Sequence, residues 1–146
     1  MNKLSWYAVA GLALVALGPG ASAQDTSQIP DLRGRWVGTN EAIVMGNAPH
    51  HPLASSPQEK PRMTLVEFTF TVEGQDGRRI WGTSASPGFK EAFVGMVRFD
   101  GKTVSVQDSD GAIDATLLDP DTLEVIYRHS ASHSVVVALS RIKRQR

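Results

Sequence analysis

Short segments that alternate apolar and polar residues, separated by closely spaced turns, are the feature that most restricts the fold of this chain. In the clearest segment, residues 64–73, Val66, Phe68, Phe70 and Val72 fall on one face, and glutamates and threonines fall on the other. A period of two residues is that of a half-buried β-strand. No segment of comparable length has the 3.6-residue period of a helix. The sequence therefore predicts an all-β protein.

Turn residues recur at short intervals: Asp76-Gly77, Asp100-Gly101, Asp110-Gly111 and Asp119-Pro120-Asp121. Asp-Gly between alternating segments is typical of tight hairpins, because glycine readily adopts positive φ. The turns delimit about eight strands, near residues 35–45, 62–73, 78–84, 90–99, 102–108, 111–118, 122–129 and 134–143. Sequential hairpins favour a meander, whose two open edges disappear only if the last strand pairs with the first. We therefore expect an antiparallel up-and-down β-barrel. Its last strand, apolar on both faces at Val135-Val136-Val137-Ala138-Leu139, would be a well-covered strand beside the one that carries Trp36.

The N-terminus has the pattern of a secretory signal peptide. A short basic start is followed by an almost wholly apolar run, Leu4–Gly18, and by the small residues Ala21-Ser22-Ala23. The run is shorter than the roughly 20 residues that a membrane span needs, so cleavage after Ala23 is favoured over an uncleaved anchor. We expect a signal peptide at 1–23, an N-terminal arm at 24–33 and a single barrel domain at 34–146, exported to the periplasm or secreted.

Composition excludes several classes of function. The 15 basic and 15 acidic residues balance, and the predicted cleavage removes only one lysine. A near-neutral domain lacks the electrostatic footprint of a nucleic-acid-binding protein. The basic C-terminal end, residues 141–146, is interpreted as a solvated terminus. The absence of cysteine excludes thiol nucleophiles and thiolate metal sites. The chain has no nucleophile elbow and no glycine-rich phosphate loop that opens a helix, so no cofactor is predicted.

Several of these features together resemble the calycin group of small barrels, which includes lipocalin-like and avidin-like proteins. They are Gly34-x-Trp36 at the head of the first strand, a long loop after that strand, a meander, and Arg141 near the end of the last strand. In lipocalins the matching tryptophan lies at the closed end of the barrel, and an arginine of the last strand packs across it. The resemblance thus implies structural roles for Gly34, Trp36 and Arg141. A guanidinium stacking on an indole face is physically favourable.

The candidate ligand-binding residues carry rings or carboxyl groups on predicted strands: Trp81, Tyr127, Phe68, Phe70, Asp114 and Glu41. The leading hypothesis is that the barrel binds a small apolar or amphiphilic molecule in its mouth, with the Pro-rich loop 46–61 as a lid. The alternative is a filled barrel that acts as a periplasmic protein interaction or inhibitor module. A barrel cyclase or isomerase is the third hypothesis; it would need Asp114, Glu41 or a similar group to face a cavity.

Two patterns bear on metal binding. The four histidines, His50, His51, His129 and His133, are predicted to be solvated loop residues. The segment Asp108-Ser109-Asp110-Gly111 begins like a calcium-binding loop but continues into a strand, without the terminal glutamate that such a loop requires. No metal site is therefore predicted.

Overall fold

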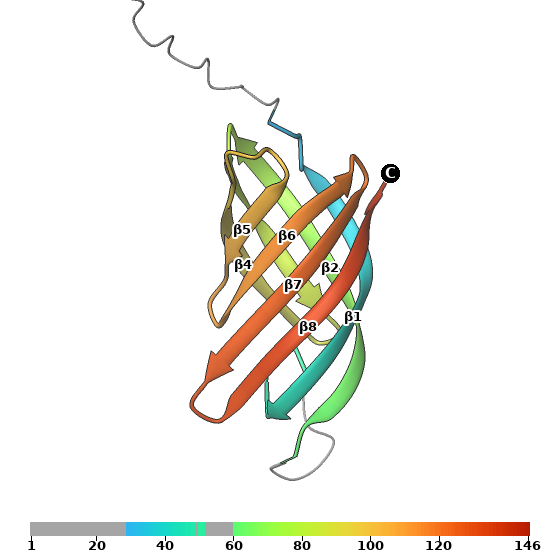
Figure 1. Cartoon of the computed structure of the whole chain (residues 1–146), viewed down its shortest axis with the longest axis vertical. Helices are drawn as coiled ribbons and strands as arrows, with labels where there is room; N and C mark the ends of the chain where they lie inside the picture. Colours follow the sequence, from blue (N-terminus) through green and yellow to red (C-terminus); the bar gives the residue numbers. More distant parts are fainter. Residues whose placement is uncertain (1–28, 49, 52–59) are drawn as a thin grey trace, which may run out of the picture.

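The chain forms a closed barrel of eight antiparallel strands in sequence order. Figure 1 shows the strands wrapped around a common axis. The computed structural model describes residues 29–48, 50–51 and 60–146; the predicted signal peptide, residues 24–28 of the arm and most of the predicted lid lie outside these residues. The strands are β1 (Gly34–Gly46), β2 (Arg62–Asp76), β3 (Arg79–Ser86), β4 (Phe89–Val97), β5 (Thr103–Gln107), β6 (Gly111–Asp119), β7 (Thr122–Ala131) and β8 (Ser134–Gln145). The all-β, eight-stranded meander barrel is confirmed. Among the described residues, no helix is long and apolar enough to cross a membrane.

The first and last strands seal the ring. β1 pairs with β8 from Trp36 opposite Arg144 to Val44 opposite Val136 and beyond. Figure 1 shows the red β8 running beside the blue-green β1 along most of its length. Each of the eight strands therefore has a hydrogen-bonded neighbour on both sides, and the ring has no edge strand. Pairing between β2 and β3 begins at Thr69, so residues 62–68 of β2 are paired with β1 alone. The predicted closure of the valine-rich last strand onto the Trp36 strand is confirmed.

The inward faces of the strands pack into one apolar core. Phe68, Phe70 and Val72 point inward as their alternation predicts, and the Phe70 ring stacks on that of Phe93 with centroids 4.3 Å apart. Gly82 lies where two backbones approach closely: a Cβ at this position would lie 1.9 Å from the Thr71 carbonyl oxygen. The remaining inward residues are mostly valine, isoleucine, leucine and alanine.

Trp36 closes the barrel end at which the chain enters β1. The ring is fully buried, and its Nε1 donates a 3.0 Å hydrogen bond to the Leu32 carbonyl. The Arg144 guanidinium lies 4.2 Å above the indole. Gly34, the first residue of β1, has a φ of 124°, a conformation that residues with a side chain rarely adopt.

The arginine partner of Trp36 differs from the one implied by the resemblance. Arg141 does not pack on Trp36; it lies on the outer face of β8, where its NH2 is 3.2 Å from Glu124. Arg144 takes that place instead. The two positions differ by three residues, and an odd shift along a strand moves a side chain to the opposite face.

Candidate functional site

The interior of the barrel is filled by its own side chains. Among the described residues, the barrel axis has a cavity of only about 10 Å³. It is lined by Asn40, Phe68, Tyr127 and three further side chains, and its volume is about that of a single water molecule. The predicted pocket residues Phe68, Phe70 and Tyr127 are buried in the core, and the cavity beside Phe68 and Tyr127 is smaller than an organic ligand.

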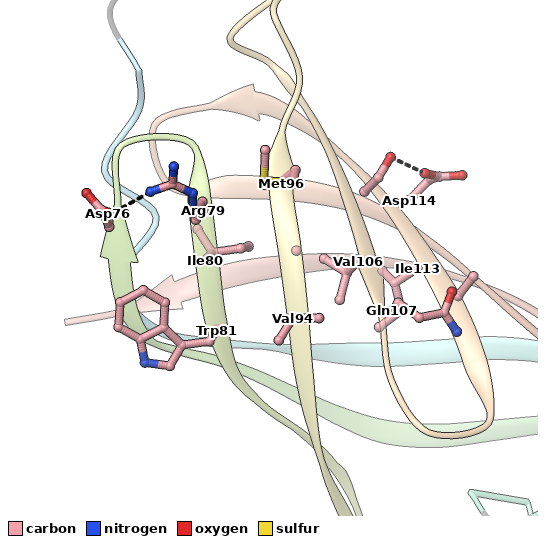
Figure 2. Close-up of a pocket in the computed structure, with 13 residues that line it drawn as sticks. Asp76, Arg79, Ile80, Trp81, Val94, Met96, Val106, Gln107, Ile113 and Asp114 are labelled. Carbon is pink, nitrogen blue, oxygen red and sulfur yellow. Dashed lines mark hydrogen bonds and ion pairs between the residues drawn. The ribbon is translucent and has the colours of Figure 1, made fainter.

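A groove of about 710 Å³ lies on the outer surface across β3, β4, β5 and β6. Figure 2 shows the side chains that line it, among which Trp81, Val94 and Met96 are exposed apolar residues. Trp81 packs against the backbone of Gly74, where a Cβ would lie 2.1 Å from the indole Cζ2. The indole is nevertheless 46% exposed. Two predicted ligand-binding residues, Trp81 and Asp114, therefore share a surface groove instead of the barrel mouth.

Asp114 is held by fixed partners on the far side of that groove. Its Oδ2 is 2.5 Å from an Arg128 guanidinium nitrogen, and its Oδ1 accepts a 2.9 Å hydrogen bond from Ser105. The hydrogen bond from Arg128 is the main reason that the pKa of Asp114 is lowered. Asp114 and Arg128 both point outward, as strand alternation predicts. A carboxylate held ionised in this way is poorly suited to exchange protons with a ligand.

A second groove, of about 870 Å³, lies on the outer surface over β8, β1 and β2. It belongs to a wider apolar patch on these three strands, which β7 joins through Ile126 and which is here called the apolar face. The face comprises Ile43, Met45, Met63, Leu65, Ile126, Val135, Val137 and Leu139. Met63 and Leu65 are 77% and 75% exposed, respectively. The register places these side chains side by side: Ile43 is opposite both Met63 and Val137. Exposed apolar patches of this extent mark interaction surfaces.

Among the residues that the structure describes, Glu41 is the one ionisable residue that lines this second groove. The register places it between Leu65 on β2 and Leu139 on β8. No hydrogen bond or ion pair joins its carboxylate to another described residue. The predicted candidate Glu41 therefore faces outward, away from the barrel interior, and carries an uncompensated charge among aliphatic side chains.

Three of the four histidines are buried at the barrel end opposite Trp36, so the prediction of solvated loop histidines is wrong for His50, His51 and His129. His50 Nδ1 lies 2.7 Å from Ser86 Oγ, and His129 Nε2 lies 2.8 Å from Ser134 Oγ. Burial lowers the pKa of His50 and, with the charge of its neighbours, lowers that of His51 to about 4. The error arose because adjacent histidines in a Pro-rich loop give no sequence signal of folding inward. His133 is exposed, as predicted.

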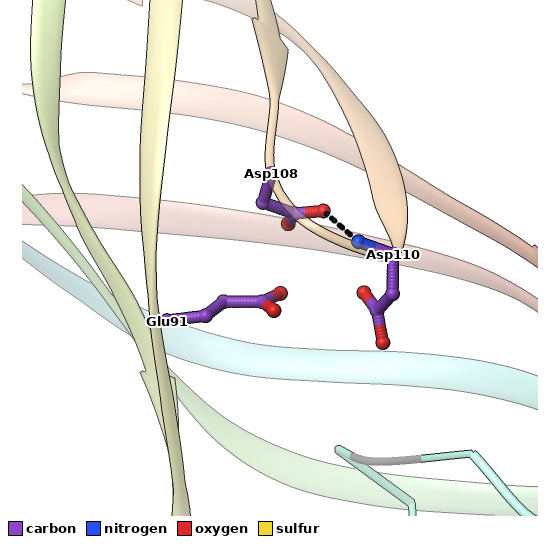
Figure 3. A group of neighbouring side chains, drawn as sticks. All are labelled: Glu91, Asp108 and Asp110. Atoms are coloured by element: carbon purple, nitrogen blue, oxygen red, sulfur yellow. Dashed lines mark hydrogen bonds between the residues drawn. The ribbon is translucent and has the colours of Figure 1, made fainter.

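Three carboxyl groups meet beside these histidines. Figure 3 shows the side chains of Glu91, Asp108 and Asp110 pointing toward one another. One oxygen atom from each lies within 4.8 Å of the other two. Oxygen ligands of this kind could hold a cation such as Ca²⁺. Burial and the neighbouring Glu91 carboxyl raise the pKa of Asp108 to about 6. Tyr127 donates a 3.1 Å hydrogen bond to Asp110, and its own pKa is raised, chiefly by burial.

The sequence missed this carboxyl cluster because its third member comes from another strand. The 108–111 turn lacks a terminal glutamate of its own, but Glu91 on β4 reaches it across the end of the barrel. Its Oε2 accepts a 2.7 Å hydrogen bond from Ser109, and its Oε1 lies 3.3 Å from His50 Nε2. Sequence spacing within one loop could not have identified this contact.

Comparisons with known proteins add little to this description. No family model matches the chain, and no curated protein matches it. A solved structure, the S-type phycobiliprotein lyase CPES from Guillardia theta, is similar in outline, with 10% sequence identity and a TM-score of 0.35. The match covers 79% of this chain and 89% of the lyase. A likeness this weak carries no inference about the ligand or activity of the present chain.

Proposed function

We propose that this protein is a binding module that uses its barrel as a rigid scaffold and docks a partner protein on its outer surface. The observation that carries the proposal is the contrast between a filled interior and a contiguous apolar face on β7, β8, β1 and β2. A soluble domain normally buries such side chains, because each exposed aliphatic group costs free energy in water. A partner that covers the face would remove that cost.

The closed topology restricts how a partner can bind. Each described strand has a paired neighbour on both sides, so little of the barrel offers an edge for strand addition. The exception beside the apolar face is β2: β3 pairs with it from Thr69 onward, and residues 62–68 are paired with β1 alone. The arrangement therefore favours recognition by side chains on the outer surface, with strand addition limited to this part of β2.

A photo-crosslinking amino acid placed at Val137, at the centre of the apolar face, tests the proposal in the host cell. The matched control position is Lys143, which lies on the outer face of the same strand but beyond the apolar half. We expect a discrete adduct from position 137 and none from position 143. The variant Leu139→Lys should abolish the adduct without lowering the melting temperature. Equal labelling from both positions, or no adduct at either, would contradict the proposal.

The groove that contains Trp81 favours a second candidate function, binding of a small apolar or amphiphilic molecule. Its volume lies within the range of about 300–1,000 Å³ typical of small-molecule pockets. Titration with apolar probes should produce a saturable change in tryptophan emission that Trp81→Phe removes, because Trp36 is buried away from the groove. An unchanged response in Trp81→Phe would exclude this groove as the site.

We also infer that the protein is exported and that its barrel is of the calycin type. The first inference rests on the apolar run Leu4–Gly18 and the small residues before Gln24. N-terminal sequencing of protein purified from its host should read from Gln24. The second rests on the Trp36–Arg144 stack at the end of a meander barrel. The enzyme hypothesis has less support, since Asp114 and Glu41 both point outward.

A further inference from the structure

We propose that the groove over β8, β1 and β2 recognises an aliphatic peptide segment that carries a lysine or arginine, with Glu41 as its ionic contact. This inference rests on the proposed docking function and specifies the chemistry of the partner. The groove offers aliphatic contacts from Ile43, Met63 and Leu65 on one side and from Val137 and Leu139 on the other.

The charge of Glu41 restricts which partners can cover the groove. A carboxylate between two leucines loses hydration as soon as an apolar partner covers it, and an uncompensated charge at a covered site strongly disfavours binding. An apolar partner without a cation would therefore be opposed by Glu41. A partner that places an ammonium or guanidinium group there would gain a charge-assisted hydrogen bond instead.

The neighbouring arginines cannot supply this compensation as they are placed. Arg128 on β7 is engaged by Asp114, and Arg141 on β8 is engaged by Glu124. Both belong to ion pairs at the border of the apolar face. In this arrangement neither guanidinium is paired with Glu41, which leaves the partner as the source of positive charge in the proposal.

The dimensions of the face favour a peptide over a small aliphatic amine. Strands lie about 4.8 Å apart, so four adjacent strands make a surface roughly 14 Å across. The outward positions of β1 on this face run from Glu41 through Ile43 to Met45, which at about 3.3 Å per residue is roughly 13 Å along the strand. One alkyl chain would leave most of this surface exposed, whereas a short segment with several aliphatic side chains would cover it.

Binding of short fluorescein-labelled peptides, measured by anisotropy, tests the inference. The peptides share soluble flanks and a leucine- and valine-rich core whose central residue is lysine, norleucine or glutamate. We expect the lysine peptide to bind most tightly, and Glu41→Gln to weaken its binding about 5- to 10-fold. Glu67→Gln is the matched control, because Glu67 is also an exposed glutamate on the outer face next to Leu65 but does not line the groove. This control should leave the affinity unchanged.

The possible outcomes separate this inference from the proposed function. Equal affinity for the lysine and norleucine peptides, or no effect of Glu41→Gln, would overturn the role of Glu41 while leaving docking on the apolar face intact. Failure of every peptide, together with a crosslinked adduct from Val137, would overturn the peptide chemistry alone. Sedimentation velocity covers the remaining occupant: a dimer that Leu139→Lys dissociates would show that a second copy of the chain covers the face, which would overturn the inference.

Discussion

Replacing Trp36 with phenylalanine should destabilise the barrel by about 2 to 4 kcal/mol. The phenyl ring cannot donate the 3.0 Å hydrogen bond to the Leu32 carbonyl, which leaves a buried acceptor unsatisfied at a cost of about 1–3 kcal/mol. The smaller ring also buries less apolar surface, at about 0.8 kcal/mol per lost methylene equivalent. For a domain of this size, the sum corresponds to a fall in melting temperature of roughly 10 °C.

The two arginines of β8 supply the matched comparison. Arg144→Met removes the guanidinium 4.2 Å above the indole and its 2.7 Å hydrogen bond to the Asp31 carbonyl, so we expect a loss of about 1–2 kcal/mol. Arg141→Met removes one exposed ion pair with Glu124 and should cost less than about 0.5 kcal/mol.

Urea unfolding followed by far-ultraviolet circular dichroism measures all three variants without relying on tryptophan emission. A double-mutant cycle between Trp36→Phe and Arg144→Met should give a coupling energy of about 0.5–1 kcal/mol, because the two groups are in contact. The reasoning would be refuted by equal losses for Arg141→Met and Arg144→Met, or by a loss under about 1 kcal/mol for Trp36→Phe.

Three further predictions concern the core, a close backbone approach and the carboxyl cluster. Phe70→Ala should cost about 3–5 kcal/mol in urea unfolding, because its ring stacks on Phe93 in the core; an unchanged midpoint would contradict this. Gly82→Ala should lower the melting temperature, since a Cβ would lie 1.9 Å from the Thr71 carbonyl oxygen; a variant as stable as the wild type would disprove that crowding. Asp108→Asn should raise stability at pH 7 by about 1 kcal/mol, allowing for partial exposure. The folded pKa of Asp108, about 6, lies above its ordinary value of 3.8, so ionisation of this carboxyl lowers stability as pH rises through that interval. The difference from wild type should disappear below about pH 4; a difference that does not vary with pH would exclude this cause.

Strand alternation predicted much of the fold because each strand has one face in the core. Alternation along β2 placed Phe68 and Phe70 inside, and alternation along β7 placed Arg128 outside. The structure agrees at each of these positions. The closure of β8 onto β1 followed from the penalty on open edges. These properties depend on local sequence and on a general rule, so a single chain was sufficient to predict them.

The functional surfaces were harder to predict because they depend on contacts between distant strands. Trp81 was expected in the barrel mouth, but alternation on β3 buries Ile80 and turns Trp81 outward. The contact between Glu91 and Asp108 depends on the register of β4 against β5 and on the length of the turns, which no local pattern specifies. The register of β8 against β1 likewise decides that Arg144, three residues after the predicted Arg141, lies over Trp36.

The outer side of β8 gives the strongest argument that the apolar face is a feature of recognition and not a by-product of strand formation. Sequence reasoning interpreted a strand apolar on both faces as a well-covered strand, yet Val135, Val137 and Leu139 are exposed. High β-propensity could account for valines on a solvated strand. It does not account for Met63 and Leu65, which are not β-branched and are the most exposed members of the face. On the same outer side of β8, the chain changes from aliphatic to basic residues at Arg141 and Lys143. From Arg141 onward, the outer side of β8 is therefore polar, as expected of a surface in contact with water. The aliphatic side chains from Val135 to Leu139 form the part that a partner would cover and so remove from water.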